Sequence, residues 1–260
     1  MTITHSPGIA VVVGGGNGIG AACCRLMRGR GWTVVAADND AVAAQAIAAE
    51  TEGYGFGVDV RDADALDRLV ADIETTVGPI AALVVSSGTF QDNVPLAQTP
   101  RDALDRILSV NFAGTYNVNR AFGPRIAASG GGSIVNLSSV TGHSSTPLNI
   151  YGPTKAAIIN MTKSFAGEWG RSGVRVNSVS PGVTLVPRVV ERRKSGVRYP
   201  TNLDEQMALG RCVEPSEVAE AVEFLCSPRA SAITGTDLVV DCGWMTASLW
   251  TSYGGVRPPL

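Results

Sequence analysis

Tyr151 and Lys155 lie four residues apart, in a segment whose apolar spacing predicts a helix over residues 151–169. Residues with this spacing share one face of a helix, so the Lys155 ammonium can lie beside the Tyr151 hydroxyl. A phenol has a pKa of about 10, and a neighbouring cation favours the phenolate and lowers that value. The pair could therefore protonate a ketone oxygen or deprotonate an alcohol. A tyrosine and a lysine on an exposed helix would show the same spacing, so other features of the chain must support this hypothesis.

A glycine-rich turn supplies the first support. It follows the apolar run Ile9–Val13 and precedes a segment with helical spacing. Glycines let backbone N–H groups approach a pyrophosphate at a helix N-terminus, where the helix dipole also favours negative charge. The spacing differs from the common G-x-G-x-x-G pattern, and a sharp strand–helix connection could also use it. We expect five residues here to contact a dinucleotide: Gly14, Asn17, Gly18, Ile19 and Gly20.

Asp38 ends the second apolar run, 18 residues after Gly20. A carboxylate at this place can accept hydrogen bonds from the adenosine ribose hydroxyls and would repel a 2′-phosphate. No arginine or lysine adjoins Asp38, and Asn17 takes the place in the turn that a basic residue could occupy. The sequence therefore predicts NAD(H) as the cofactor. Capping of the helix after this run is expected from Asp40 rather than from Asp38.

Small and acidic residues end the next two apolar runs. Asp59 and Val60 could frame the adenine, although Asp59 could equally cap the helix that follows. Ser86 and Gly88 follow the fourth run, where small side chains would let the chain pass close to the cofactor. We include all four residues among the candidate cofactor contacts.

Seven apolar runs alternate with helical segments along the chain. They cover residues 9–13, 32–37, 54–60, 80–85, 133–137, 174–179 and 238–240. Runs that are apolar on both faces suit parallel strands covered by helices on each side. Strand–helix alternation also requires crossover connections, which are right-handed. We predict an α/β fold: a doubly wound parallel sheet of about seven strands flanked by helices, the Rossmann fold, in a single domain over residues 1–260.

Two further segments surround this framework. A helix is predicted over residues 100–126, with Thr99 as its N-cap and Leu104, Ile107, Leu108, Asn111 and Thr115 on one face. Residues 181–209 show no clear strand or core helix, which predicts a lid-like substrate segment at about 183–210. Its cations are either solvated or recognise a carboxylate or phosphate on the substrate: Arg188, Arg192, Arg193, Lys194 and Arg198. His143 is either a pocket wall or a partly exposed loop residue.

Composition narrows the class of protein. The net charge of −2 in 260 residues gives no general attraction to nucleic acid or to an anionic membrane. No apolar run approaches the roughly 18 residues of a membrane span, and the N-terminus lacks a signal-peptide pattern. Five cysteines without a Cys-x-x-Cys pair indicate reduced thiols and a cytoplasmic location. Two histidines without clustered ligands predict no metal site.

Taken together, these motifs resemble those of single-domain members of the short-chain dehydrogenase/reductase family, from about Gly8 to Trp244. The glycine turn is similar to the family's nucleotide turn, and Tyr151 and Lys155 are similar to its active-site pair. Three further segments resemble its serine-bearing strand end, its asparagine segment and the turn after its sixth strand: Asn136–Gly142, Val110–Gly114 and Pro181-Gly182.

The resemblance implies a role for each matched residue. Ser139 would hydrogen-bond the substrate oxygen, with Ser138 as the alternative. Asn111 would interrupt helix bonding and hold a water that links Lys155 to solvent, whereas an isolated mid-helix asparagine would simply be solvated. Cofactor contacts are implied for Tyr151, Lys155, Pro181, Gly182 and Thr184.

We therefore expect an NAD(H)-dependent oxidoreductase that interconverts a small secondary alcohol and a ketone, with Tyr151 as general acid/base. The alternative is a non-catalytic dinucleotide-binding redox sensor or regulatory protein. Intact Ser139, Tyr151 and Lys155 favour the enzyme, because a sensor needs no acid–base pair. The resemblance also implies a homotetramer built from the helices at 100–126 and 151–169, with a homodimer as the alternative.

Overall fold

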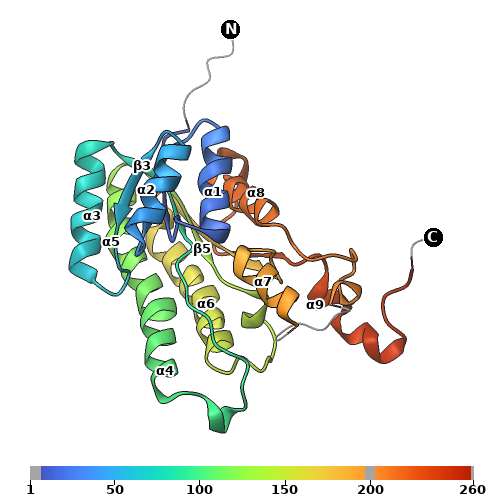
Figure 1. Ribbon diagram of the computed structural model, residues 1–260. Coiled ribbons are helices and arrows are strands. Elements are labelled where there is room, and N and C mark those ends of the chain that lie inside the picture. The colour runs from blue at the N-terminus through green and yellow to red at the C-terminus, as the bar shows by residue number, and fades with distance from the viewer. Residues whose placement is uncertain (1–6, 197–202, 259–260) are drawn as a thin grey trace.

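Seven parallel strands form one sheet, in the order β3-β2-β1-β4-β5-β6-β7 (Figure 1). The computed structural model describes residues 7–196 and 203–258. The strands are β1 Ile9–Val13, β2 Thr33–Asp38, β3 Tyr54–Gly57, β4 Ile80–Val85, β5 Gly132–Leu137, β6 Val174–Pro181 and β7 Asp237–Val240. The predicted doubly wound parallel sheet of seven strands is confirmed. The predicted run at 54–60 is shortened, because the strand ends at Gly57.

Helices cover both faces of the sheet. The described residues form α1 Gly18–Gly29, α2 Ala41–Glu50, α3 Ala63–Thr76, α4 Arg101–Ile107, α5 Thr115–Ala128, α6 Tyr151–Trp169, α7 Pro187–Ser195, α8 Pro215–Cys226 and α9 Trp244–Ala247. None of these helices has both the length and the apolar composition that a membrane span requires.

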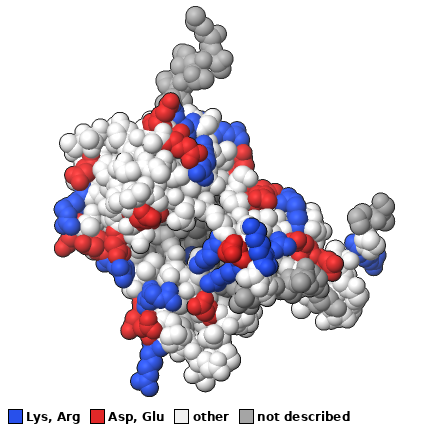
Figure 2. Space-filling view, in the orientation of Figure 1, with Lys and Arg blue, Asp and Glu red and all other residues white. Residues whose placement is uncertain are grey.

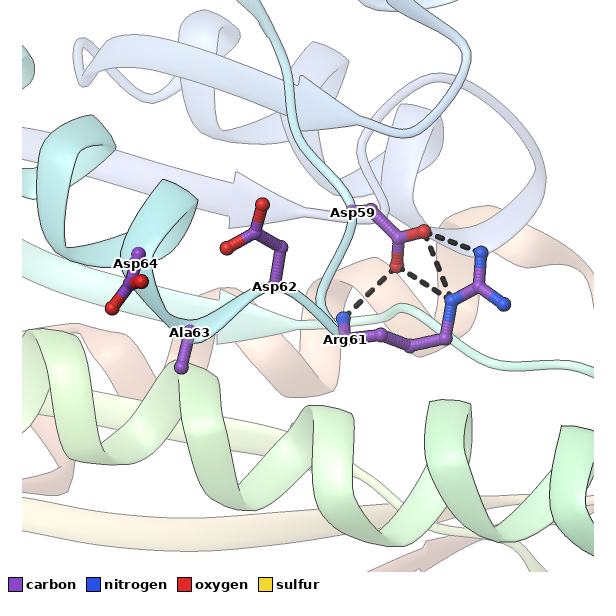
Figure 3. A pocket seen from close by; sticks show the side chains of 5 residues that line it. All are labelled: Asp59, Arg61, Asp62, Ala63 and Asp64. Carbon is purple, nitrogen blue, oxygen red and sulfur yellow. Dashed lines mark hydrogen bonds and ion pairs between the residues drawn. The ribbon is translucent and has the colours of Figure 1, made fainter.

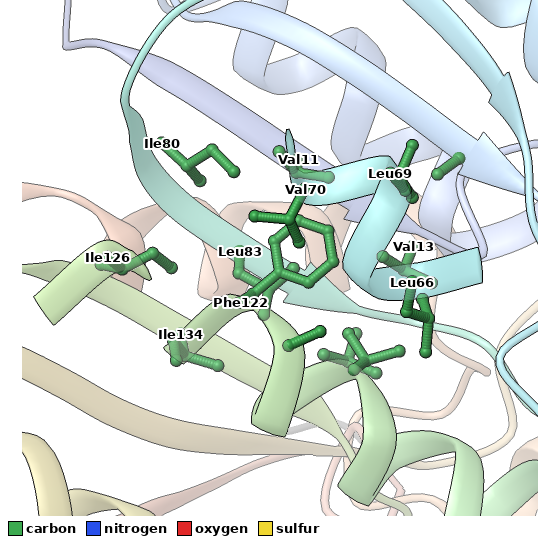
Figure 4. Packing of buried hydrophobic residues seen from close by; sticks show 14 of the residues in the cluster. Val11, Val13, Leu66, Leu69, Val70, Ile80, Leu83, Phe122, Ile126 and Ile134 are labelled. Carbon is green, nitrogen blue, oxygen red and sulfur yellow. The ribbon is translucent and has the colours of Figure 1, made fainter. Parts of the chain in front are cut away.

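Alternate residues of each central strand enter two separate apolar layers. Val11 and Val13 pack with Phe122 of α5 and with leucines of α3 on one face of the sheet (Figure 4). Ala10 and Val12 face the other way, into a layer covered by α1 and α8. Burial on both faces explains why the strands read as continuous apolar runs rather than as alternating patterns. It also makes the strand ends rigid supports for the loops that follow them.

The strand order reverses beside β1. The chain moves from β1 outward to β2 and β3, and then returns so that β4 pairs with the other side of β1. Connections therefore diverge from the carboxyl ends of β1 and β4, and ligands of doubly wound sheets bind in the crevice that this divergence leaves. The glycine turn follows β1, and Ser86–Gly88 follows β4. These two predicted cofactor segments therefore follow the strands at which the order reverses.

The predicted helix over residues 100–126 is interrupted. α4 begins at Arg101 after Pro100 and makes no side-chain cap, so the N-cap assigned to Thr99 is wrong. A π-helix, η2, spans Leu108–Gly114 and separates α4 from α5. Along this stretch Leu104 and Leu108 are exposed, while Ile107 and Asn111 are fully buried. The predicted face was therefore correct for Ile107, Asn111 and Thr115 and wrong for Leu104 and Leu108.

The predicted lid-like segment contains a helix that the sequence pattern did not indicate. α7 spans Pro187–Ser195 and is followed by Gly196, whose φ of +67° suits glycine. Val189 of α7 joins Val183, Leu203 and Met207 in a small apolar cluster apart from the two main layers. The prediction of a segment without a core helix is therefore wrong for residues 187–195.

Candidate functional site

The glycine turn is closely packed against the neighbouring strand ends. The N–H groups of Gly14 and Gly15 both donate to the carbonyl oxygen of Ala37, at 2.7 and 3.1 Å. A Cβ atom at Gly14, where φ is +82°, would lie 2.4 Å from the backbone nitrogen of Ser87. A Cβ atom at Gly20 would lie 1.9 Å from the Gly14 carbonyl oxygen. Only glycine fits these positions, and the close packing brings the N-terminus of α1 to the crevice.

Asp38 lies against this turn. Its Oδ2 atom accepts a hydrogen bond from the Gly16 N–H at 2.9 Å, and its Oδ1 atom accepts one from the Asp40 N–H at 3.0 Å. The carboxylate is therefore fixed at the edge of the crevice. Asp40 caps α2 by accepting from the Ala43 N–H at 3.0 Å, which confirms the prediction that Asp40 rather than Asp38 is the cap.

Asp59 is paired with Arg61 on the surface. Arg61 Nε lies 3.0 and 2.9 Å from the two carboxylate oxygens, and this pair lowers the pKa of Asp59 (Figure 3). The cap of α3 is Asp62, which accepts from the Ala65 N–H at 2.9 Å. Capping by Asp59 is therefore wrong. Val60 is buried and faces Gly114 of the π-helix.

Lys155 is buried beside Tyr151. Its Nζ atom lies 5.5 Å from the centre of the Tyr151 ring and donates to the carbonyl oxygen of Leu137 at 2.8 Å. A Cβ atom at Gly88 would lie 3.8 Å from the same Nζ atom. Burial lowers the pKa of Lys155 from 10.5 to about 8. The ends of β4 and β5 and the first turns of α6 thus meet around one ammonium group.

The two adjacent serines have different partners. Ser138 donates its hydroxyl to the carbonyl oxygen of Lys155 at 2.8 Å, which ties the end of β5 to α6. The Oγ atom of Ser139 accepts from the Thr141 N–H at 3.2 Å, and this leaves the Ser139 hydroxyl proton for another acceptor. The geometry therefore favours Ser139 over Ser138 as a donor to a substrate oxygen.

Asn111 lies within the π-helix, where helical hydrogen bonding is altered as expected. Its side chain forms a reciprocal pair with the Thr89 backbone: Oδ1 accepts from the Thr89 N–H at 2.7 Å, and Nδ2 donates to the Thr89 carbonyl at 2.9 Å. A Cβ atom at Gly88 would lie 3.6 Å from Oδ1. The side chain is fully buried, so the interpretation of Asn111 as a solvated residue is wrong.

The chain after β6 forms the opposite wall of the crevice. The Gly182 N–H donates to the Val240 carbonyl at 2.9 Å, and a Cβ atom at Gly182 would lie 2.8 Å from the Asp241 Cβ. Thr184 pairs with Val213 in an isolated parallel bridge. Just beyond it, Val186 approaches Gly18, where a Cβ atom would lie 3.4 Å from Val186 Cγ1. The start of α7 therefore faces the start of α1.

Most described cations of the lid-like segment have partners within the protein. Figure 2 shows basic side chains gathered over α7, beside a hollow in this face of the molecule. Arg192 Nη2 lies 3.1 Å from Asp92 Oδ1, and Arg193 Nη2 lies 2.7 Å from Asp204 Oδ2. The Arg188 guanidinium lies over the Phe90 ring, 3.5 Å from its centre. Arg198 lies outside the described residues.

His143 joins the loop after Ser139 to the edge of the sheet. Its Nε2 atom lies 2.8 Å from Asp237 Oδ2 and 3.3 Å from Ser180 Oγ. The residue also lines a pocket between this loop and the first turns of α6. Both predicted roles thus describe part of its position, because the ring is partly exposed and lies at a pocket wall. Among the described residues, no group of three or more His, Cys, Asp or Glu side chains could hold a metal ion.

Two residues in contact with Tyr151 were missed from the sequence. Phe90 stacks on the Tyr151 ring, and Gln91 accepts hydrogen bonds at the start of α6. They precede Tyr151 by about 60 residues, and no spacing rule relates them to it. The one available signal was their place, two and three residues after Gly88.

Comparison with known proteins gives consistent matches over nearly the whole chain. The family model described as enoyl-(acyl carrier protein) reductase matches residues 13–245. Galactitol 2-dehydrogenase (L-tagatose-forming) of Cereibacter sphaeroides is 36% identical over 90% of this chain and 94% of its own length.

Two solved structures are also similar. One, described as ribose-5-phosphate isomerase from Brucella melitensis 16M, is 40% identical with a TM-score of 0.93, over 98% of both chains. Another, described as a short chain dehydrogenase/reductase family protein, is 35% identical with a TM-score of 0.79. It covers 91% of this chain and 97% of its own.

Proposed function

Because the chain belongs to the short-chain dehydrogenase/reductase family, we propose that it is an NAD(H)-dependent enzyme that interconverts a small secondary alcohol and a ketone. One observation carries the proposal: a buried lysine lies beside a tyrosine ring, where the ends of two central strands meet. A binding module that only senses the cofactor has no need to bury a cation at this cost in solvation.

The residues around the crevice fit a nicotinamide dinucleotide. Gly14 and Gly20 allow the turn to pack closely at the N-terminus of α1, where backbone N–H groups and the helix dipole would favour a pyrophosphate. Lys155, Gly182 and Thr184 would hold the nicotinamide half. When bound, the nicotinamide supplies or accepts the hydride.

The chain's own residues would manage the proton and the substrate oxygen. Ser139 would donate its hydroxyl to that oxygen and stabilise the negative charge that develops on it. Tyr151 would give its proton to the oxygen in reduction and take it back in oxidation. With a pKa of about 8, Lys155 is mostly charged at neutral pH, and this nearby charge favours the tyrosinate. Asn111 would orient the Thr89 backbone and support a water at Lys155.

The preference for NAD(H) would come from Asp38. Two backbone N–H groups hold its carboxylate beside the glycine turn. A carboxylate fixed at this point can accept from both ribose hydroxyls, and it would repel a 2′-phosphate by like charge. Asp59, in contrast, is engaged by Arg61 and would contribute to the adenine site only through the adjacent backbone.

A sugar alcohol is the substrate class that we infer from the relatives. The galactitol dehydrogenase is named for a polyol, and Figure 2 shows charged side chains beside the hollow near α7. Galactitol and L-tagatose should therefore be tested with NAD(H) and NADP(H). Turnover measured by NADH absorbance, abolished by Tyr151→Phe, is the expected result. Tight cofactor binding without turnover of any alcohol or ketone would instead favour the redox sensor.

A second candidate function comes from the similar Brucella structure, which is described as an isomerase. If this chain were an isomerase acting on ribose 5-phosphate, it would form the product without any net change in NADH absorbance. Incubation with ribose 5-phosphate in the absence of cofactor, followed by analysis of the sugar phosphates, separates the two functions. We expect no conversion under these conditions, because the acid–base pair lies beside the predicted nicotinamide site.

We also propose that the protein assembles as a homotetramer through α4, α5 and α6. Four apolar side chains, each four residues after the last, are exposed along α4, η2 and α5: Leu104, Leu108, Phe112 and Tyr116. The ring centres of Tyr116 and of Phe165 in α6 are 6.2 Å apart, so the stripe continues toward that helix. Burial of this stripe against a second copy would remove a continuous apolar surface from water.

A further inference from the structure

We propose that Phe90 and Gln91 position the acid–base tyrosine, one through its ring and the other through its backbone. The proposal rests on the catalytic role proposed above for Tyr151. It assigns a function to the loop after β4, which otherwise would only let the chain pass the cofactor. Both residues act on Tyr151 and neither exchanges a proton with the substrate.

Gln91 caps the helix that begins with Tyr151. The first N–H groups of a helix have no carbonyl partner within it, and a preceding side chain commonly accepts from them. Here the preceding residue, Ile150, makes no such cap. Gln91 Oε1 accepts instead from the Ile150 N–H at 2.8 Å and from the Tyr151 N–H at 3.1 Å. The cap of α6 is thus supplied from a distant part of the chain.

The Gln91 side chain is itself held in one orientation. It is only 2% exposed, and its Nε2 atom donates to Asn149 Oδ1 at 2.9 Å. A buried amide with this set of partners has both its oxygen and its nitrogen assigned. The oxygen therefore points at the helix start, and rotation of the amide would break three hydrogen bonds at once.

Phe90 holds the Tyr151 ring. The two ring centres are 5.2 Å apart with an angle of 17° between the planes, which is a stacked arrangement. The Arg188 guanidinium also lies over Phe90, 3.5 Å from the ring centre. The phenol therefore has an aromatic wall on one face, and α7 covers that wall. This wall limits the angle at which the hydroxyl can approach the substrate oxygen.

The loop that carries both residues is fixed to the π-helix region. Asn111 pairs with both backbone groups of Thr89. Arg106 Nη1 lies 2.8 Å from Thr89 Oγ1 and 3.4 Å from the Phe90 carbonyl oxygen. The residues next to Phe90 and Gln91 are therefore held from α4 and η2. Small displacements of a catalytic group reduce the rate strongly, so a fixed support of this kind has a catalytic effect.

The test compares Gln91→Met, which keeps size but loses the acceptor, with Asn149→Ala, which removes only the Nε2 partner. We expect Gln91→Met to lower kcat by about 10- to 100-fold and to shift the pH dependence of kcat to higher pH, with the KM for NAD unchanged. Asn149→Ala should keep kcat within about threefold of wild type. Amide hydrogen exchange at residues 150 and 151 should become faster in Gln91→Met, because both N–H groups lose their acceptor.

Ring variants test the second half of the proposal. Phe90→Leu should lower kcat in the same way. Phe90→Tyr keeps the aromatic ring and should therefore keep the wild-type kcat. They also decide the question if Gln91→Met does not fold. Folded Gln91→Met and Phe90→Leu proteins with the wild-type kcat and pH profile would overturn the positioning role and leave the proposed function intact. A wild-type protein without alcohol or ketone turnover would overturn the proposed function, and the positioning role with it.

Discussion

The Nζ atom of Lys155 lies 5.5 Å from the centre of the Tyr151 ring and is anchored to the Leu137 carbonyl at 2.8 Å. The hydrogen bond to the end of β5 thus fixes the position of the ammonium group. Its position beside the phenol is set by the sheet and by the helix together. This relationship has consequences for activity and for stability that can be measured separately.

Tyr151→Phe should reduce kcat by roughly a hundredfold or more, since it removes the group that would exchange the proton. NADH affinity should change much less, because the ring and its stack with Phe90 remain. Steady-state kinetics and a fluorescence titration with NADH give the two quantities. A kcat equal to that of the wild type would exclude Tyr151 as the general acid/base.

Lys155→Met should change how stability depends on pH. Burial lowers the pKa of Lys155 in the folded protein to about 8, from 10.5, so the unfolded chain binds more protons between these values. The free energy of unfolding of the wild type should therefore rise relative to the variant between pH 8 and 10.5, by up to about 3 kcal/mol. Below pH 8 the difference should be constant. Urea unfolding of both proteins across this range provides the test, and parallel curves would contradict it.

Asp38→Ala should weaken NADH binding by about tenfold or more, because the charged acceptor for the ribose hydroxyls is lost. The ratio of NADH affinity to NADPH affinity should decrease, because the carboxylate no longer repels the 2′-phosphate. Asp40→Ala is the matched control. It removes the cap of α2 and should lower stability by about 1 kcal/mol without changing the ratio of the two affinities. A wild-type protein that prefers NADPH would contradict the assignment of Asp38.

The two serines should respond differently to alanine. Ser139→Ala should lower kcat by about a hundredfold, as expected for loss of a donor to the substrate oxygen. Ser138→Ala breaks the bond to the Lys155 carbonyl, so we expect a loss of about 1 kcal/mol in stability with a smaller effect on kcat. If the kinetic losses were reversed, Ser138 would be the substrate donor.

Phe112→Asp should lower the molecular mass measured by light scattering, because it places a charge within the exposed stripe of α4, η2 and α5. Tyr54→Asp serves as the control, since Tyr54 is an equally exposed aromatic residue on β3. The control should keep the wild-type mass. If the wild type and both variants had equal masses, the exposed stripe would not be part of a subunit interface.

The sheet could be predicted almost completely from the sequence, because its buried parallel strands contain continuous apolar runs that can be recognised without knowledge of their neighbours. The helix over residues 151–169 was equally clear. The π-helix was not predicted as such, since one wider turn leaves little trace in composition and shifts the exposed face by one residue. α7 was missed for a different reason: its charged residues give it only one fully buried side chain, Val189.

The candidate site was predicted where adjacent residues carry the chemistry, as at Tyr151 and Lys155. It was missed where contacts join distant segments. The sequence does not predict that Arg188 lies over Phe90 or that Phe90 stacks on Tyr151. These contacts depend on how α7, the loop after β4 and the start of α6 are placed relative to one another. Asp59 shows a local limit instead, because its pairing with Arg61, two residues later, depends on the path of the chain after β3.

The N–H groups at the start of α6 donate to the side chain of Gln91, which precedes α4 and α5 in the sequence. During folding, the N–H groups of Ile150 and Tyr151 therefore lack this acceptor until the loop after β4 has docked against α6. An intermediate with native secondary structure would already contain the tyrosine and the lysine on one helix, yet hold them loosely. Recovery of activity during refolding should then lag behind recovery of the helical circular dichroism signal.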